Sequence, residues 1–297
     1  MVKDKFASYH PIVNFTFFLG AIGCGMVLMH PGYLLCSMTL SMLYYLTVHG
    51  RNALRYLMAM LVLFVLLSVI NPIFNTYGEM ILFSYMNGRL YTLEALLFGM
   101  ALAAVVVSVL CWFASFNAVM TDDKLLYLSS RTAPAVSLVF TMALRLIPSY
   151  KNKIAQMNGA RKGIGKGTDT GSVKDRLRHG MVLLSALVSW ALEGGVITSD
   201  SMYSRGYGCG KRTCFSLCRF EKRDRCLLFY MAVTLGTVLI CCMKGAAAAS
   251  FTPHLQIAGK ENPYVPAGVL AYFLFLLIPS AVNIWEEIRW YNLKSKI

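Results

Sequence analysis

The sequence predicts an all-α, polytopic membrane protein with about six transmembrane helices and two long amphipathic helices on the cytoplasmic side. Of its 297 residues, 57% are hydrophobic and only 14% are charged, whereas soluble globular proteins carry about 25% charged residues. Long apolar runs recur along the chain, and most of the positive charge lies in one segment between them. A soluble domain of this length would need more polar surface.

Six apolar runs have about the length needed to cross a bilayer, which takes roughly 20 residues. They are Ile12–Met29, Tyr33–Val48, Tyr56–Ile70, Ala95–Met120, Cys226–Met243 and Val265–Ile284. None contains Asp, Glu, Lys, Arg or His. The first run lacks a convincing small-residue cleavage site, so we expect a transmembrane helix there and not a cleaved signal peptide.

The basic connections set the orientation, because cytoplasmic loops of membrane proteins carry an excess of Lys and Arg. With six spans, both termini and every basic connection fall on the cytoplasmic side of the cell membrane. The basic parts are the N-terminus (Lys3, Lys5), the loop with Arg51 and Arg55, the stretch Arg145–Arg225, and the tail with Arg289, Lys294 and Lys296. The predicted division is 1–120 with four spans, 121–225 as a cytoplasmic region, and 226–297 with two spans and a cytoplasmic tail.

The stretch Arg145–Arg225 holds sixteen of the 28 Lys and Arg residues and six of the 14 Asp and Glu residues, which is +10 of the net +14. Such a charge suits nucleic acid, anionic lipid or an acidic protein. Nucleic-acid faces usually interleave aromatic side chains for stacking, and Lys151 to Lys174 contains none. We therefore expect no nucleic acid as a partner.

Two helices are predicted within this basic stretch. From Ile147 the apolar residues recur at helical spacing (Ile147, Tyr150, Ile154, Met157), which indicates an amphipathic helix. After a glycine-rich break, a second helix is predicted from near Ser172 to Arg205.

Each predicted helix runs into an arginine that is followed within two residues by glycine. The two sequences are Ala160-Arg161-Lys162-Gly163 and Ser204-Arg205-Gly206-Tyr207-Gly208. Glycine readily takes the left-handed conformation that ends a helix, and a cation in the last turn complements the helix dipole. We expect each helix to present an arginine at its tip, an arrangement suited to an acidic groove on another protein.

The residues predict no metal site, cofactor or catalytic centre. Cys209, Cys214 and Cys218 lack the second pair or histidines that would complete a zinc site, and Asp122-Asp123 is interpreted as the start of a helix. The glycines at 163–167 do not match a phosphate loop, because no Ser or Thr follows the Gly-Lys pair directly.

Several segments resemble the transmembrane T component of energy-coupling factor (ECF) transporters, the family that includes the cobalt-transporter permeases. Ala143-Leu144-Arg145-Leu146-Ile147-Pro148 is similar to the segment that leads into the family's first coupling helix. Ala160-Arg161 resembles the first arginine motif, with Lys162 where glycine or serine is usual. Asp200 to Gly208 resembles the second motif, with Ser204 in place of alanine, and Lys211-Arg212-Thr213 continues it. Thr92-Leu93-Glu94-Ala95 also has the character of the family.

The resemblance implies a non-catalytic coupling subunit of an ATP-driven importer for a vitamin or a transition-metal ion. Two cytoplasmic ABC ATPase subunits would each receive one coupling helix, through Ala160, Arg161 and Lys162 at one site and Ser204, Arg205, Gly206 and Tyr207 at the other. A separate substrate-binding membrane subunit, the S component, would pack against the spans. ATP-driven closure of the ATPase pair would shift the two coupling helices relative to each other, and that movement would be passed to the S component.

Two other functions stay open on the residues alone. One is a membrane scaffold whose basic region binds anionic lipid. The other is a membrane enzyme that modifies an anionic head group, for which Glu193 and Asp200 are the best candidates and have no obvious partner. The lipid hypothesis predicts that Lys and Arg are interchangeable, whereas docking predicts that Arg161 and Arg205 are special.

Overall fold

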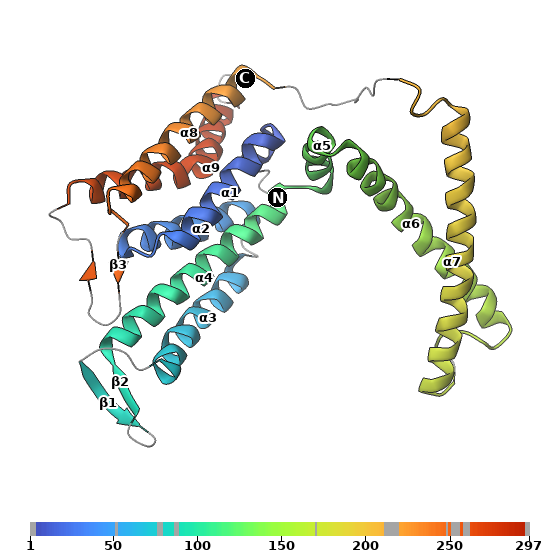
Figure 1. Ribbon diagram of the computed structural model, residues 1–297, viewed down its shortest axis with the longest axis horizontal. Coiled ribbons are helices and arrows are strands. Elements are labelled where there is room, and N and C mark those ends of the chain that lie inside the picture. The colour runs from blue at the N-terminus through green and yellow to red at the C-terminus, as the bar shows by residue number, and fades with distance from the viewer. Residues whose placement is uncertain are drawn as a thin grey trace. The chain divides into compact units, whose positions relative to one another are not determined.

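The computed structural model describes residues 4–50, 53–75, 80–85, 89–169, 171–210, 220–247, 249–250, 256–257 and 262–294. In these parts the chain is almost entirely helical (Figure 1). The short 3₁₀ helix η1 (Phe6–Ser8) precedes α1 (Pro11–Val27), α2 (Pro31–His49), α3 (Ala53–Phe74), α4 (Leu93–Val119), α5 (Asp122–Thr132), α6 (Pro134–Gly163), α7 (Val173–Ser204), α8 (Lys222–Met243) and α9 (Tyr264–Lys294). Two short antiparallel hairpins, which the sequence did not indicate, pair β1 (Ile81–Tyr85) with β2 (Arg89–Thr92) and β3 (Ala249–Ser250) with β4 (Gln256–Ile257).

Five of the described helices are long and apolar enough to cross a membrane: α3, α4, α7, α8 and the Tyr264–Trp290 part of α9. This confirms an all-α polytopic membrane protein. The six expected spans fall on α1, α2, α3, α4, α8 and α9. Four of these, α3, α4, α8 and α9, are among the five candidates; α1 is a shorter apolar helix of 17 residues, and α2, with 19 residues, is not among the candidates. The fifth candidate, α7, was predicted outside the bilayer. Length and composition do not exclude it as a span, although its mean hydropathy of 1.7 is lower than the 2.1 to 2.5 of the other four candidates.

The chain forms two compact units. One contains Met1–Leu125 together with Cys218–Ile297, and the other contains Leu126–Leu217. The helices before and after the insertion therefore pack as one body, with α2 against α4 and α9, α1 against α4 and α8, and α8 against α9.

Trp112 on α4 lies at the centre of the first unit and is fully buried. Its ring packs against Phe17 at 5.5 Å and Tyr44 at 6.0 Å between ring centroids, so that α1, α2 and α4 meet around it. Phe17 continues the cluster to Phe275 on α9 at 5.3 Å. The buried indole N–H donates to the Ser37 hydroxyl at 3.3 Å, which satisfies a polar group that would be costly to leave unpaired in an apolar interior.

The helices α1 and α2 begin in the same way. His10 and His30 precede Pro11 and Pro31, and each imidazole Nδ1 accepts a hydrogen bond from the backbone N–H two residues later, at 3.3 and 3.2 Å. Proline suits the first helical position because its missing N–H would be unpaired there anyway. The repeated His-Pro pair is therefore explained as a helix start.

The segment Asp4–His10, which we call the N-terminal latch, joins the ends of several helices. The Asn283 amide of α9 accepts from the backbone N–H groups of Lys5 (2.9 Å) and Phe6 (3.2 Å), and it donates to Asp4 Oδ1 at 2.7 Å. Asp4 Oδ2 accepts from the Tyr44 hydroxyl of α2 at 2.8 Å.

The latch also reaches the start of α5 and the start of α8. Lys124 Nζ donates to the carbonyls of Ala7 (2.6 Å) and Val119 (2.8 Å), which places a cation on the unpaired carbonyl end of α4. The buried Asp224 carboxylate accepts from the His10 N–H at 3.4 Å and caps α8 through the Glu221 N–H at 2.9 Å. The latch thus fixes the point at which the chain leaves the first unit.

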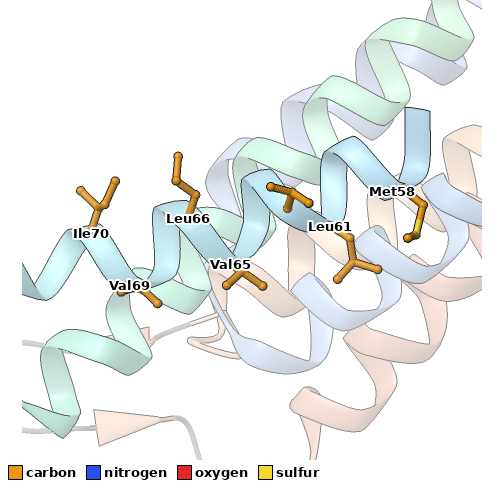
Figure 2. A pocket seen from close by; sticks show the side chains of 7 residues that line it. Met58, Leu61, Val65, Leu66, Val69 and Ile70 are labelled. Atoms are coloured by element: carbon orange, nitrogen blue, oxygen red, sulfur yellow. The ribbon is translucent and has the colours of Figure 1, made fainter. Parts of the chain in front are cut away.

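The outer face of α3 carries an apolar groove of about 530 Å³ (Figure 2). Side chains of this one helix line it: Met58, Leu61, Val62, Val65, Leu66, Val69 and Ile70. The lining offers almost no polar surface. It therefore suits contact with lipid tails and provides no polar side chain that could bind a substrate.

In the second unit, α6 is longer than its sequence predicts. The amphipathic pattern indicated a helix from Ile147, but α6 begins at Pro134 and continues through Pro148. Proline removes one backbone hydrogen bond without ending every helix, so the stretch 134–144 is the first part of α6. The helix α7 begins at the predicted place, with Ser172 and Asp175 forming a reciprocal capping box.

The latch yields the first prediction. Asn283→Ala removes two acceptor contacts and one donor contact. The Lys5 N–H and the Asp4 carboxylate each lose a partner, while the Phe6 N–H keeps its bond to Asp4 Oδ1. We expect the free energy of unfolding to fall by about 2 kcal/mol. Thermal unfolding of the purified protein in detergent would measure it, with Thr16→Ala as the control because Thr16 is exposed and bonds only its own helix. Equal melting temperatures for the two variants would contradict a stabilising latch.

Candidate functional site

The tip of α6 ends in a Schellman motif. The N–H of Lys166 bonds the carbonyl of Arg161 at 2.9 Å, and the N–H of Gly165 bonds the carbonyl of Lys162 at 3.0 Å. Gly165 has φ +70°, the left-handed conformation that this motif requires. Gly163, which the sequence suggested as the terminating residue, is instead the last residue of the helix. Arg161 therefore lies inside the last turn of α6.

The tip of α7 repeats the same motif. The N–H of Tyr207 bonds the carbonyl of Met202 at 3.1 Å, and the N–H of Gly206 bonds that of Tyr203 at 3.0 Å. Gly206 has φ +75° and occupies the place that Gly165 occupies in α6. Arg205 is the residue directly after the helix, so the two arginines do not hold equivalent positions relative to their glycines. Both tips are nevertheless defined turns in which the backbone fixes the direction of the arginine.

The two helices run antiparallel (Figure 1). Tyr150 on α6 meets Trp190 on α7 with ring centroids 5.6 Å apart, and Lys153 Nζ lies 5.2 Å from the centroid of the same indole ring. Eleven residues further along α6, Arg161 contacts His179, which is eleven residues back along α7. Moving one residue forward along α6 therefore corresponds to moving one residue back along α7.

This register separates the two arginines. Arg161 lies beside His179, near the start of α7, whereas Arg205 lies at its far end. The 26 residues from His179 to Arg205 correspond to about 39 Å along a helix that rises 1.5 Å per residue. The structure therefore places the two predicted tips at opposite ends of the α6–α7 pair and does not bring them into one site.

The surroundings of the two arginines also differ. Arg161 is half-buried, and its Nη2 lies 3.4 Å from His179 Nδ1. Arg205 is exposed, and within the part of the chain that the structure describes its guanidinium has no side-chain partner. Two tyrosines flank it, Tyr203 at 85% and Tyr207 at 46% exposure. Arg205 with these rings forms a protruding cationic and aromatic tip.

The neighbours of the arginines contribute to the tips in different ways. Ala160 is exposed on the last turn of α6. The Ser204 hydroxyl donates to the Asp200 carbonyl of its own helix at 2.7 Å, so this residue packs as a small one. Lys162 forms an ion pair with Asp169 in the loop after α6. The hydrogen bond and the charge of Lys162 hold the pKa of the Asp169 carboxyl below its usual range.

The loop after α6 folds back onto the helix that precedes it. The Asn158 side-chain oxygen accepts from both the backbone N–H and the hydroxyl of Thr168, each at 3.1 Å. Sequence reasoning missed Asn158, Asp169 and His179 as parts of this end. Antiparallel packing of the two predicted helices would have brought the start of the second helix close to Arg161, and this is the signal that could have pointed to His179.

The described residues include no group of three or more His, Cys, Asp or Glu side chains that could hold a metal ion. Glu193 and Asp200, the carboxylates considered for an enzyme, are both exposed on α7. Lys211-Arg212-Thr213, Cys214 and Cys218 lie outside the described residues, whereas Cys209 is an exposed free thiol.

The chain matches no protein-family model. It is 32% identical over 102 residues to the energy-coupling factor transporter transmembrane protein EcfT of Listeria innocua. It is 28% identical over 106 residues to the protein of the same name from Lactobacillus helveticus. Over these stretches the chain is similar to EcfT. These matches cover 34% and 35% of the chain and 38% of each relative, so the similarity to EcfT extends over little more than a third of the relatives' length.

The glycine at the α7 tip yields the second prediction. Gly206→Ala places a Cβ on a left-handed residue, which costs roughly 1–2 kcal/mol, so the last turn of α7 should fray. We expect hydrogen exchange of the Gly206 and Tyr207 amides to accelerate about tenfold. Gly194→Ala, in the exposed middle of α7 with nothing near a new Cβ, is the control and should leave these amides unchanged. Protection that is equal in both variants would contradict the role of Gly206.

Proposed function

We propose that this chain is the transmembrane coupling subunit of an ECF-type ABC importer. In this proposal the tips of α6 and α7 dock on two cytoplasmic ABC ATPase subunits. The motion that ATP drives in those subunits passes through the chain to a separate substrate-binding membrane subunit, for uptake of a vitamin or a transition-metal ion. The chain itself would be non-catalytic. The observation that carries the proposal is the position of Arg161 and Arg205, about 39 Å apart at opposite ends of one helical pair.

That separation suits two partners better than one. A single compact ligand cannot touch both tips at once, whereas two globular subunits lying side by side have centres tens of ångströms apart. Arginine is suited to such docking because its planar guanidinium makes bidentate, charge-assisted hydrogen bonds to carboxylates. Because the Schellman motifs fix both tips to their helices, a force applied at a tip would move the whole helix about the Tyr150–Trp190 contact.

The charge at both ends of α7 supports a cytoplasmic place for this helix. Lys174, Arg176 and Arg178 lie at its start, and Arg205 lies at its end. A span would put one of these cationic ends outside the cell, against the bias of cytoplasmic loops towards Lys and Arg. With α7 in the cytoplasm, the six spans would be α1, α2, α3, α4, α8 and α9, and both termini would be cytoplasmic, in the cell membrane of a prokaryote.

Labelling from either side of the membrane tests this topology. Two single-cysteine variants are compared, one with Lys174→Cys and one that keeps only Cys209. We expect a membrane-impermeant maleimide to label both in inside-out vesicles and neither in intact cells, because both ends of α7 are cytoplasmic. A variant with the single cysteine Lys294→Cys reports the side of the C-terminus. Labelling of positions 174 and 209 from opposite sides would show that α7 crosses the membrane.

The two alternatives predict different behaviour. A lipid-binding scaffold would respond to total charge, and it gives no reason for two defined arginine tips. An enzyme would need convergent groups, but Glu193 and Asp200 are exposed, with no described acid or base gathered beside them.

Loss of partners tests the docking role. Arg161→Glu and Arg205→Glu should each weaken association with the ATPase subunits by about thirtyfold or more, because breaking a desolvated charge pair costs about 2–5 kcal/mol. The measurement is co-purification of ATPases with the tagged chain from membranes, quantified by mass spectrometry.

Lys151→Glu and Lys174→Glu are the matched charge reversals: both residues are exposed, Lys151 in the middle of α6 and Lys174 in the first turn of α7. Lys153 is unsuitable because it lies over the Trp190 ring. Retention of ATPases by the lysine variants and their loss from the arginine variants would support docking. If wild type brought down no ATPase, the transporter proposal would fail; equal losses in all four variants would favour a response to total charge.

A further inference from the structure

His179 is half-buried in the second turn of α7 and faces the tip of α6 across the antiparallel pair. Its Nδ1 lies 3.4 Å from Nη2 of Arg161. A guanidinium has only donor N–H groups and stays protonated in proteins, so this contact requires an Nδ1 that carries no proton. The imidazole is therefore an acceptor that holds one arm of the guanidinium fork.

The rest of the Arg161 fork lacks such a partner. Its Nε is buried, and among the described residues nothing accepts a hydrogen bond from it. A buried donor left unpaired costs free energy, and a docking partner can supply acceptors only to those donors of the fork that stay accessible. With one arm tied to His179, the remaining donors keep a fixed direction. At the other tip, Arg205 is exposed and has no comparable support within the described chain.

We propose that His179 is a positioning residue, which orients Arg161 for docking and releases it when the imidazole is protonated. This inference rests on the proposed coupling function and deepens it. The two tips become unequal: the α6 tip is pre-organised and sensitive to pH, whereas the α7 tip is neither. Pre-organisation strengthens binding because less side-chain freedom is lost on association.

The charged groups around His179 set the sign of the pH effect. From α6 it faces the Arg161 cation. On its own helix, Asp175 lies four residues before it and Arg176 three, and Asp175 Oδ2 accepts from the Ser172 N–H at 3.3 Å. From the loop, Asp169 is paired with Lys162, and its lowered pKa keeps it ionised at pH 5.5. A protonated imidazole offers two donors and no acceptor, so it would repel Arg161 and turn towards Asp175, one turn away.

Because the imidazole is the side chain that commonly changes charge between pH 5 and 8, the test compares pH 8.0 with pH 5.5. A photo-crosslinking residue replaces Lys166, beside the α6 tip, or Cys209, beside the α7 tip. The full chain is purified in detergent with the ATPases that accompany wild type, and the yield of crosslinks to them is measured. Each tip therefore has its own readout in the same complex.

Three variants separate positioning from folding. His179→Ala removes the acceptor. His179→Asn can place a side-chain oxygen near the position of Nδ1, and that oxygen does not titrate. Arg178→Gln is the control, since it changes an exposed neighbour that takes no part in the contact.

We expect His179→Ala to lower the crosslink yield from position 166 about fivefold at pH 8.0, the effect of one net hydrogen bond, with no change from position 209. Wild type should lose a similar factor at position 166 between pH 8.0 and 5.5. His179→Asn should keep the yield at both pH values, and Arg178→Gln should behave as wild type.

Three results would overturn the inference while leaving the coupling function intact: an unchanged yield for His179→Ala, a parallel fall at both positions, or a pH response that persists in His179→Asn. If His179→Ala fails to fold, wild type and His179→Asn still decide the question through their pH profiles. Absence of any ATPase from the wild-type preparation would overturn both the coupling function and the role of His179.

Discussion

A bilayer offers no water to backbone N–H and C=O groups, so a chain that spans it must satisfy these groups within helices. This constraint accounts for most of the first unit. Its helices are apolar over their length, they meet around the aromatic cluster at Trp112, and the indole N–H is satisfied by Ser37. Polar side chains that link helices gather at the helix ends, where the N-terminal latch joins α2, α4, α8 and α9 through Asp4, Asn283, Lys124 and Asp224.

The second unit obeys a different constraint, the antiparallel packing of α6 on α7. Only a few side chains make this contact, chiefly Tyr150, Lys153 and Trp190, and most of α7 is exposed. Because few side chains join the two helices, the local structure at their ends matters more. The ends carry two Schellman motifs, a capping box and a folded-back loop. The exposed apolar surface of α7 is large enough to look like a span, yet its ends are cationic on both sides. Those two properties together suit a helix that works between a membrane and soluble partners.

The asymmetry between the tips follows from the same packing. α6 ends near the start of α7, so Arg161 meets the first turns of α7 and contacts His179, whereas Arg205 follows the last turn of α7 with exposed tyrosines on either side of it. Two similar sequence motifs therefore give one arginine that contacts the neighbouring helix and one arginine that is exposed. In a coupling subunit, two ATPases would then bind the two tips with unequal affinity, although the two motifs are similar in sequence.

The sequence by itself determined the membrane class, the positions of the helices that form the first unit, and the ends of α7, because apolar run length, capping residues and glycines act locally. It also indicated both arginine tips, since a cation before a helix-ending glycine is a local signal. It did not determine that α6 continues through Pro148, because the loss of one hydrogen bond is decided by the rest of the helix. Nor could it place His179 on Arg161, or Asn283 on Asp4, across 279 positions of chain. Those contacts depend on the register of packed helices, which only the tertiary structure decided, because a side chain meets its distant partner only once both helices are in place.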